Sequence, residues 1–407
     1  MKILFLTSDK YPPFRPAAKV IFGKSLPKRG HIVDWLIQQA DEFKDHGDAT
    51  EINGQVYMAR TVSGESRMKR WLKYMADIQN DFNVFRLTRK KRYDLVLVKD
   101  KYIAGVLAAL ATRLSKTPFC FWLAYPHAEA DIYASTHNTA RYKWIYWIRG
   151  QCRKFALYKI ILRTADHVFV QSQRMRLDLS EKGIEPKKMT PVPSSVAIEE
   201  YPVDDLLSWP ERLQLHGERI VYFGTLQRER RLDFLVRAFE KVVKIRPDAK
   251  FDIIGRGNSP EDDALIDREI TRLRLEGSVV RHGHLNPPDA IKIIKRSAVC
   301  LSPYYGIEIL KSTSPTKLVE YLALARPVVA TTHPEQDFVL SQCEGGISTP
   351  WDESAFAAAI CSILENPQAG DEMGNRGRAY VEAERTDERM TDLVEHTCEA
   401  TISNYGQ

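Results

Sequence analysis

The sequence of 407 residues lacks several patterns that mark other classes of protein. No apolar run approaches the roughly 18 residues that a membrane-spanning helix needs. No low-complexity tract or internal repeat is present. The chain starts with Lys2 and a short apolar stretch before Ser8, which predicts a first strand and not a signal peptide. We therefore expect a globular protein that is made and kept in the cytoplasm.

Patterns for metals and disulfides are missing as well. The six cysteines are widely spaced, without a C-x-x-C pair or an ordered Cys/His cluster of the kind that zinc requires. No Asp-x-Asp element is present, since the pair Asp204-Asp205 falls in a linker and Asp262-Asp263 at a solvated helix start. The sequence therefore predicts buried thiols in a reducing compartment, no metal and no other cofactor.

The basic residues are concentrated in one segment, although the net charge of the chain is only +6. Residues 141–163 hold seven Lys or Arg residues and no acid, interleaved with Trp and Tyr, and residues 67–75 have the same character. Such helices are typical of proteins that lie on an anionic membrane surface, with aromatic rings at headgroup level. The alternative is a long core helix whose aromatic side chains pack inward.

Nucleic-acid binding is the main non-enzymatic alternative for a basic chain. The sequence has no helix-turn-helix spacing, no aromatic sheet motif and no zinc module. We therefore expect no nucleic-acid partner. From the basic aromatic segments we expect a peripheral location on the inner face of the membrane.

Short β-rich runs alternate with helical patterns, which predicts the α/β fold class. In the first half we expect helices at about 104–115, 136–163 and 172–183, and strands at 3–7, 32–37, 56–59, 95–99, 119–123 and 167–171. A second series begins afresh, with strands at 220–224, 251–255, 279–283, 299–302, 328–331 and 346–348. Two doubly wound, Rossmann-like domains are predicted, and such sheets bind ligands at the carboxyl ends of their strands.

The segment that starts at Ser314 combines a helix start, a cation and a carboxylate. We expect Ser314 as the N-cap and Pro315 as the first helical residue. The backbone amides of Thr316 and Lys317, together with the positive end of the helix dipole, then attract an anion. Glu320 follows on the same helical face as Lys317, where its carboxylate accepts hydrogen bonds from sugar hydroxyls. The segment predicts a diphosphate beside a sugar, as in a nucleotide.

These residues, and others that follow one another in order, resemble the retaining nucleotide-sugar glycosyltransferases of family 4. The similar segments are 221–226, 230–233, 253–257, 280–285, 314–321, 326–331 and 345–352. The resemblance implies the GT-B fold, in which two Rossmann-like domains face each other across a cleft. Residues 1–198 would form the acceptor-binding domain, 199–385 the nucleotide-sugar-binding domain, and 386–407 a helix that can return to the first domain.

Carried over residue by residue, the resemblance implies a donor site in the second half. Glu320 matches the second Glu of the family's Glu-x7-Glu element, which holds the ribose, whereas Ser312 stands in place of the first Glu. The family's Gly-Arg-Leu and Lys-Gly elements, which neutralise the diphosphate, are matched by Gly224-Thr225-Leu226 and Arg230-Arg231. Arg also binds phosphate. The backbone of His284 or Leu285 would contact the base.

In the first half, the family's Gly-Gly loop is replaced by a segment whose cations Arg15 and Lys19 are expected to supply charge. His127 matches the place of a His that faces the donor sugar, with a structural His as the alternative. Glu129 and Asp131 are nearby candidates for contact with acceptor hydroxyls. The catalytic candidates are thus His127, Arg230 and Lys317.

The function that the resemblance implies is transfer of a sugar, with retention and without a metal, from a nucleoside-diphosphate sugar to a glycan or lipid-linked acceptor. Such a reaction belongs to the biosynthesis of cell-surface polysaccharides or glycoconjugates. A hydrolysing UDP-N-acetylhexosamine epimerase of the same fold is an alternative, and it would need carboxylates and a His as acid and base. A non-catalytic binding protein is another, because the first Glu, one cation and the Gly-Gly loop are altered.

Overall fold

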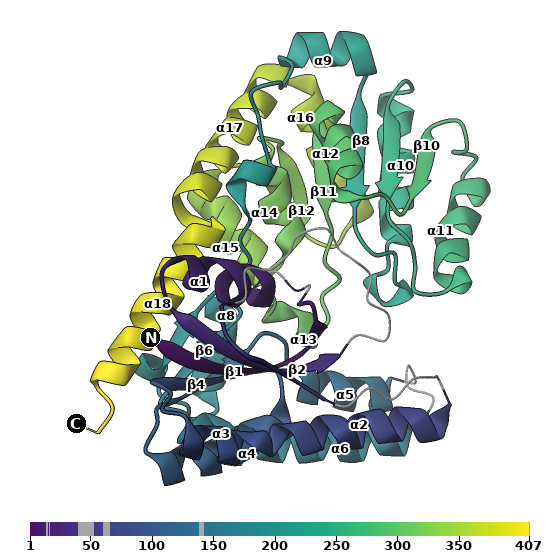
Figure 1. Cartoon of the computed structure of the whole chain (residues 1–407). Helices are drawn as coiled ribbons and strands as arrows, with labels where there is room; N and C mark the ends of the chain where they lie inside the picture. Colours follow the sequence, from purple (N-terminus) through teal and green to yellow (C-terminus); the bar gives the residue numbers. More distant parts are fainter. Residues whose placement is uncertain (14, 16, 40–52, 60–65, 138–141, 407) are drawn as a thin grey trace. The chain divides into compact units, whose positions relative to one another are not determined.

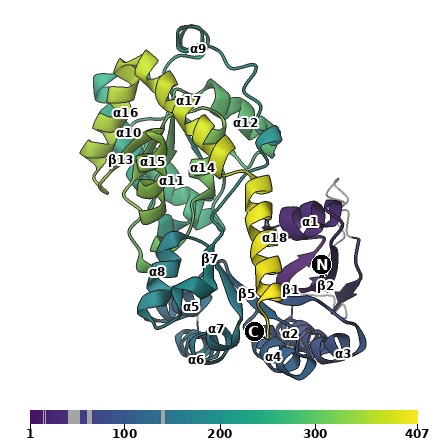
Figure 2. The same cartoon turned by 90° about the vertical axis from the view of Figure 1, so that its left-hand side faces the viewer.

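The computed structural model describes residues 1–406 apart from 14, 16, 40–52, 60–65 and 138–141. The chain forms two compact units, one of Met1–Pro193 with Asp387–Gln407 and one of Ser194–Thr386. Each unit contains one parallel sheet with helices on both faces (Figure 1, Figure 2). The prediction of two doubly wound α/β domains is confirmed.

The sheet of the first unit has the strand order β3-β2-β1-β4-β5-β6-β7, and all neighbouring strands are parallel. Its strands are β1 (Lys2–Tyr11), β2 (Ile32–Gln39), β3 (Val56–Met58), β4 (Leu95–Lys99), β5 (Phe119–Leu123), β6 (His167–Val170) and β7 (Met189–Pro191). The sequence did not predict β7, which is short and contains a Pro. The order reverses between β1 and β4, so ligands are expected at the carboxyl ends of these two strands.

Alternate side chains of β1 enter two different cores. Ile3 and Phe5 pack with η1 (Ala17–Ser25), α1 (Leu26–Lys28) and α18 (Asp387–Ser403). Leu4 and Leu6 pack in the other core, with α3 (Asn83–Lys90), α4 (Tyr102–Ser115), η2 (Ala156–Ile161), α7 (Leu162–Thr164) and α8 (Gln173–Glu181). Because side chains alternate along a strand, a sheet covered on both faces requires apolar residues at every position.

The helix that was expected at 136–163 is wrong in extent. The chain instead forms α5 (His127–Thr136) and α6 (Lys143–Phe155), which continues into η2. A close approach joins α5 and α6, because a Cβ at Gly150 would lie 2.7 Å from the side chain of Ile132. Trp144 is 67% exposed, and Trp147 and Ile148 are exposed as well. The inward-packing alternative for this segment is therefore contradicted.

The second unit repeats the architecture with the strand order β10-β9-β8-β11-β12-β13. Its strands are β8 (Arg219–Phe223), β9 (Lys250–Ile254), β10 (Val279–Gly283), β11 (Val299–Ser302), β12 (Val328–Thr331) and β13 (Gly346–Thr349). One face is covered by α9 (Trp209–His216), α10 (Asp233–Ile245), α11 (Pro260–Arg272) and α16 (Glu353–Glu365). The other is covered by α12 (Pro287–Arg296), α14 (Thr316–Ala323), α15 (Pro334–Cys343) and α17 (Pro367–Glu384). All six strands predicted here are confirmed within one residue at each end.

The cysteines, the start of α11 and the lengths of the helices bear on three further expectations. Five of the six cysteines are buried, but Cys152 on α6 is exposed, contrary to the prediction. Asp262 is buried, since its carboxylate caps the start of α11 and pairs with Arg228 at 3.0 Å, whereas the neighbouring Glu261 is exposed, so the expectation of a solvated helix start is wrong for Asp262 alone. Within the described part of the chain, every helix is too short or too polar to span a bilayer.

Candidate active site

The helix start at the centre of the predicted site is displaced by one residue. α14 begins at Thr316, so Pro315 occupies the N-cap position and no side chain of the described residues caps the helix. The hydroxyl of Ser314 instead accepts a hydrogen bond of 3.0 Å from the backbone N–H of Ser194. The N-cap role predicted for Ser314 is therefore wrong. The first amides of α14 keep the partial positive charge that binds an anion.

The end of β8 holds α14 close to the carboxyl edge of the second sheet. The hydroxyl of Tyr321 accepts a hydrogen bond of 2.8 Å from the backbone N–H of Phe223. One turn earlier, the Lys317 side chain lies directly over Gly224, where an added Cβ would be 1.8 Å from Lys317 Cε. The Lys317 amine also lies 5.9 Å from the centre of the Tyr222 ring. Position 224 thus requires a glycine, because any side chain there would occupy the space of the Lys317 side chain.

Beside Gly224, the charged groups of Lys317, Glu320 and Arg230 interact with one another. Burial and the nearby Arg230 lower the pKa of Lys317 to about 7, while the Glu320 carboxylate opposes this shift. Burial raises the pKa of Glu320, against the effects of Lys317 and of the Tyr201 hydroxyl, which donates a hydrogen bond of 3.4 Å to Glu320 Oε1. When Lys317 is protonated, two cations and one carboxylate leave an excess of positive charge, which favours the binding of an anion such as a diphosphate.

Tyrosines around these charges were not recognised in the sequence. Burial raises the pKa of Tyr222 and of Tyr304, although the positive charge of the nearby Arg230 opposes this shift. The Arg231 guanidinium lies 5.6 Å from the centre of the Tyr305 ring. The Tyr304-Tyr305 pair, separated by one residue from the end of β11, could have been noticed, because that strand borders the switch point of this sheet.

Replacing Gly224 by Ala tests whether the position of the Lys317 side chain over Gly224 matters for anion binding. The added methyl would displace the flexible end of Lys317, and at the Gly224 φ of 153° it would also strain the backbone. We expect nucleotide affinity to fall by about tenfold to 100-fold, the loss typical of one or two charge-assisted hydrogen bonds. Calorimetric titration measures it. Gly217→Ala is the matched control, since Gly217 also has a positive φ, of 70°, but nothing lies within 4 Å of its added Cβ. An equal loss of affinity in both variants would contradict a role for the position of Lys317.

The other residues predicted for the donor site have less specific surroundings. Thr225 and His284 are exposed, and Leu285 packs partly against the core below α12. Ser312 ends α13 (Glu308–Lys311), and the side chain of Glu308 points to solvent and pairs with Lys311. Glu308 therefore lies outside the buried group of Lys317, Glu320 and Arg230.

Of the residues predicted in the first unit, Arg15 lies between β1 and η1, Lys19 lies on η1, and the other three lie on α5. Arg15 pairs with the buried Asp9 of β1 at 3.1 Å, four residues before Lys19 on η1. His127 begins α5 after the end of β5, beside Tyr125, and burial lowers its pKa.

Two carboxylates of α5 bind neighbouring side chains. Glu129 accepts a hydrogen bond of 2.5 Å from the Tyr158 hydroxyl, and Asp131 pairs with Arg149 and Arg153 of α6. Their contact with an acceptor stays a prediction.

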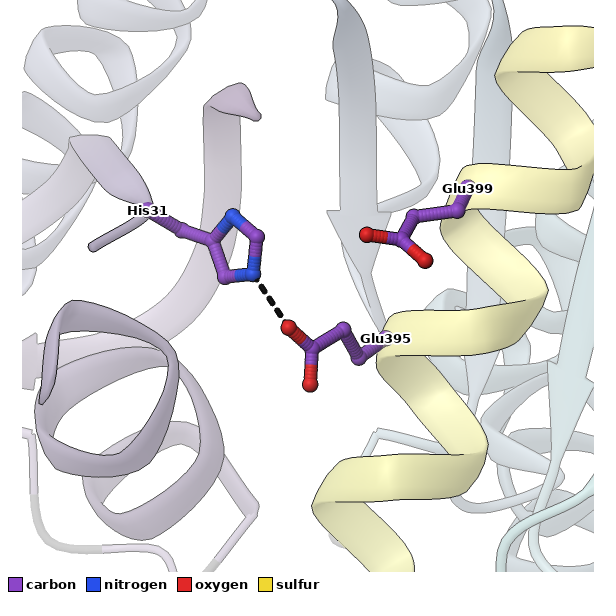
Figure 3. A group of neighbouring side chains, drawn as sticks. All are labelled: His31, Glu395 and Glu399. Carbon is purple, nitrogen blue, oxygen red and sulfur yellow. Dashed lines mark hydrogen bonds and ion pairs between the residues drawn. The ribbon is translucent and has the colours of Figure 1, made fainter. Parts of the chain in front are cut away.

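One group of potential metal ligands exists among the described residues, formed by His31, Glu395 and Glu399 (Figure 3). His31 Nε2 and Glu395 Oε1 are 2.5 Å apart, and Arg29 pairs with the other oxygen of Glu395. A metal bound to these two atoms would have to replace the contact between them. The contacts attach α18 to the start of β2, and the group serves as an anchor between these elements.

Comparisons with known proteins agree with this architecture. The glycosyl transferases group 1 family matches residues 217–366, and the glycosyl transferase 4-like domain matches residues 22–194. No curated protein sequence matches the chain.

Three solved structures show the same fold. HepE from Anabaena in complex with UDP has a TM-score of 0.71 and 17% identity, over 98% of this chain and 100% of its own. Sucrose-phosphate synthase from Thermosynechococcus elongatus has a TM-score of 0.74 and 18% identity, over 99% and 100%. The lipopolysaccharide outer core galactosyltransferase WaaB has a TM-score of 0.63 and 15% identity, over 98% and 99%.

The two family matches lie one in each unit and together cover most of the chain. The chain belongs to the group 1 glycosyltransferases of family 4 and has their GT-B fold. It is a nucleotide-sugar-dependent glycosyltransferase. The resemblance stated from the sequence is thereby confirmed.

Proposed function

We propose that this protein transfers a hexose, with retention and without a metal ion, from a UDP-sugar to a lipid-linked or glycan acceptor at the membrane surface. The observation that carries the proposal is the buried group of Lys317, Glu320 and Arg230 at the start of α14. The HepE structures that contain UDP and UDP-glucose support uridine as the first base to test.

In the proposed reaction the diphosphate leaves while the acceptor hydroxyl attacks on the same face of the sugar. The departing phosphate oxygen takes the proton of that hydroxyl. Lys317, Arg230 and the first amides of α14 then stabilise the negative charge that develops on the diphosphate. Glu320 holds the ribose, and His127 keeps the role that the family resemblance implies, beside the donor sugar. The protein contributes positioning and charge stabilisation.

Calorimetric titration with UDP, GDP, ADP and dTDP, each with and without EDTA, tests the donor site. We expect saturable binding of UDP that EDTA leaves unchanged and that Glu320→Ala weakens by about tenfold, the value of one charged hydrogen bond to the ribose. Glu308→Ala is the matched control, because its carboxylate is exposed and pairs with Lys311. Failure of all four nucleotides to bind would favour a non-catalytic binding protein, and loss of binding with EDTA would overturn the metal-free mechanism.

Membrane contact is part of the proposal, and the exposed faces of α2 (Arg67–Asp81) and α6 support it. On α2 the side chains of Met68, Trp71, Leu72, Tyr74 and Met75 are exposed, and on α6 those of Trp144, Ile145, Trp147, Ile148 and Phe155. Lysines accompany both sets, and α6 contains no acid. Exposed aromatic side chains beside cations match the headgroup region of an anionic bilayer.

Vesicle flotation tests this contact. We expect the protein to float with vesicles that contain phosphatidylglycerol and not with pure phosphatidylcholine vesicles, and binding should fall as salt is raised. The double variant Trp144→Ser/Trp147→Ser should lose most of the bound fraction, because both indoles lie outside the core. Leu215→Ser, at a similarly exposed apolar residue of α9 in the second unit, is the control. Equal flotation with both lipids would contradict the charge dependence.

A further inference from the structure

A cavity of about 820 Å³ lies within the first unit. Its walls are formed by α2, α4 and α6, which Figure 1 shows beside the first sheet, and Ser8 of β1 and Gln38 of β2 line it as well. Its volume falls within the range of about 300–1,000 Å³ that is usual for small-molecule sites. Asp100 and Lys101 bring it to the carboxyl end of β4, next to the switch point between β1 and β4. This is where a doubly wound sheet binds ligands.

One end of the cavity carries an excess of buried carboxylates. Lys101 Nζ lies 2.6 Å from Asp77 Oδ1 and 2.6 Å from Asp81 Oδ1, so one ammonium group faces two carboxyl groups of α2. Burial raises the pKa of Asp81 to about 6, although Lys101 lowers it. Asp100 also lines this end and is paired with Lys99 at 3.2 Å. Carboxyl oxygens in this arrangement accept hydrogen bonds from the hydroxyl groups of a sugar or a polyol.

The wall formed by α6 carries the opposite charge. Arg149 and Arg153 both pair with Asp131, at 2.5 Å and 2.7 Å, so two guanidinium groups share one carboxylate. Their side chains are 42% and 33% exposed, so both remain accessible from the solvent. Arg groups in excess over carboxylates are typical binding partners of phosphate.

An apolar wall connects these two polar regions. It is formed on α4 by Ile103, Val106 and Leu107. Farther along the same helix Leu110 and Leu114 are 52% and 64% exposed, so the apolar surface continues out of the cavity. A ligand that fits all three surfaces has a hydroxylated part, a phosphate and an apolar chain.

We propose that this cavity is the acceptor site and that the acceptor is an amphiphile whose head joins a hydroxylated ring to a phosphate. The hydroxyls bind at Asp77, Asp81 and Lys101, the phosphate binds at Arg149 and Arg153, and the apolar chain lies along α4. This inference rests on the proposed function, because only a sugar transferase requires an acceptor here. Glycerolipids and isoprenoid phosphates can both supply this chemistry.

Labelling of Cys152 tests the site without enzymatic turnover. Cys152 lines the cavity and is the one exposed thiol among the six cysteines, so a maleimide should react there first. The probes are short-chain lipids below their micellar concentrations. Dihexanoyl phosphatidylinositol and geranyl glucosyl phosphate have the complete head, dihexanoyl phosphatidic acid has phosphate alone, and hexyl glucoside has hydroxyls alone. Either complete head should slow labelling about tenfold at ten times its Kd, and the stronger of the two identifies the source of the acceptor.

Three outcomes overturn the proposal while UDP binding is retained. They are no protection by either complete head, equal protection by phosphatidic acid, and equal protection by hexyl glucoside. Leu107→Trp, which fills the apolar wall, should remove the protection and leave UDP affinity unchanged. Leu177→Trp, at an exposed residue of α8 that does not line the cavity, should keep the protection. Protection that survives Leu107→Trp also counts against the site. Failure of UDP to bind concerns the second unit alone and overturns the proposed function instead.

Discussion

Lys317→Met should lower kcat/KM by about 10²-fold to 10³-fold, the loss typical of removing one group that stabilises developing charge. Met keeps the length and packing of the Lys stem, so the side chain still fills the space above Gly224. What disappears is the cation beside the leaving diphosphate. The loss should appear mainly in kcat, because the charge on the diphosphate grows as its bond to the sugar breaks.

The same variant should be at least as stable as the wild type. Burial lowers the pKa of Lys317 to about 7 from 10.5, so the folded protein is harder to protonate there than the unfolded chain. Protonating this buried amine costs free energy, and Met removes that cost. The gain in the free energy of unfolding should be full below about pH 7, and it should shrink as the pH rises towards the ordinary lysine pKa of 10.5. A rise in Tm together with a loss of turnover separates a catalytic effect from unfolding.

Two further variants complete this experiment. Lys311→Met removes an exposed cation of α13 that pairs with Glu308, and it should change neither activity nor Tm. Arg230→Ala should lower kcat in the same direction as Lys317→Met. A Lys317→Met enzyme with normal kcat would remove Lys317 from the catalytic group, whatever its Tm.

The strands of the fold could be predicted because they are buried on both faces. Runs such as Leu95–Lys99 and Val328–Thr331 contain almost only apolar residues between polar turns, and their bounds are the predicted ones. The helix expected at 136–163 has the wrong extent, because the run of Trp, Tyr and Ile gives no local signal that α5 ends at Thr136 and α6 begins at Lys143.

The candidate site could be predicted where it follows from local sequence. Lys317 and Glu320 are three residues apart on one helix, so their common face was expected. The position of Gly224 against Lys317 depends on the packing of α14 on β8, which no spacing reveals. The cavity of the first unit was missed for the same reason, because Asp77 and Lys101 meet only in three dimensions.

Nucleotide binding should be coupled to proton uptake above neutral pH. With a pKa near 7, Lys317 is mostly neutral at pH 8.5 in the free protein. A bound diphosphate raises this pKa by its negative charge, so the complex takes up close to one proton. Nucleotide affinity should then be highest below pH 7 and fall by up to about tenfold for each pH unit above it. The second phosphate ionisation of the nucleotide lies near pH 6 and is complete in this range.

Titration of UDP at pH 7 to 9 in buffers of different ionisation enthalpy measures this uptake directly. Lys317→Met should bind UDP more weakly and without the pH slope. In Glu320→Gln the slope should begin at lower pH, because the carboxylate that raises the Lys317 pKa is lost. The expected order of the variants follows from the signs of four effects: burial and Arg230 favour the neutral amine, whereas Glu320 and the diphosphate favour the protonated one. An identical slope in wild type and Lys317→Met would assign the proton to another group and separate diphosphate binding from the charge of this lysine.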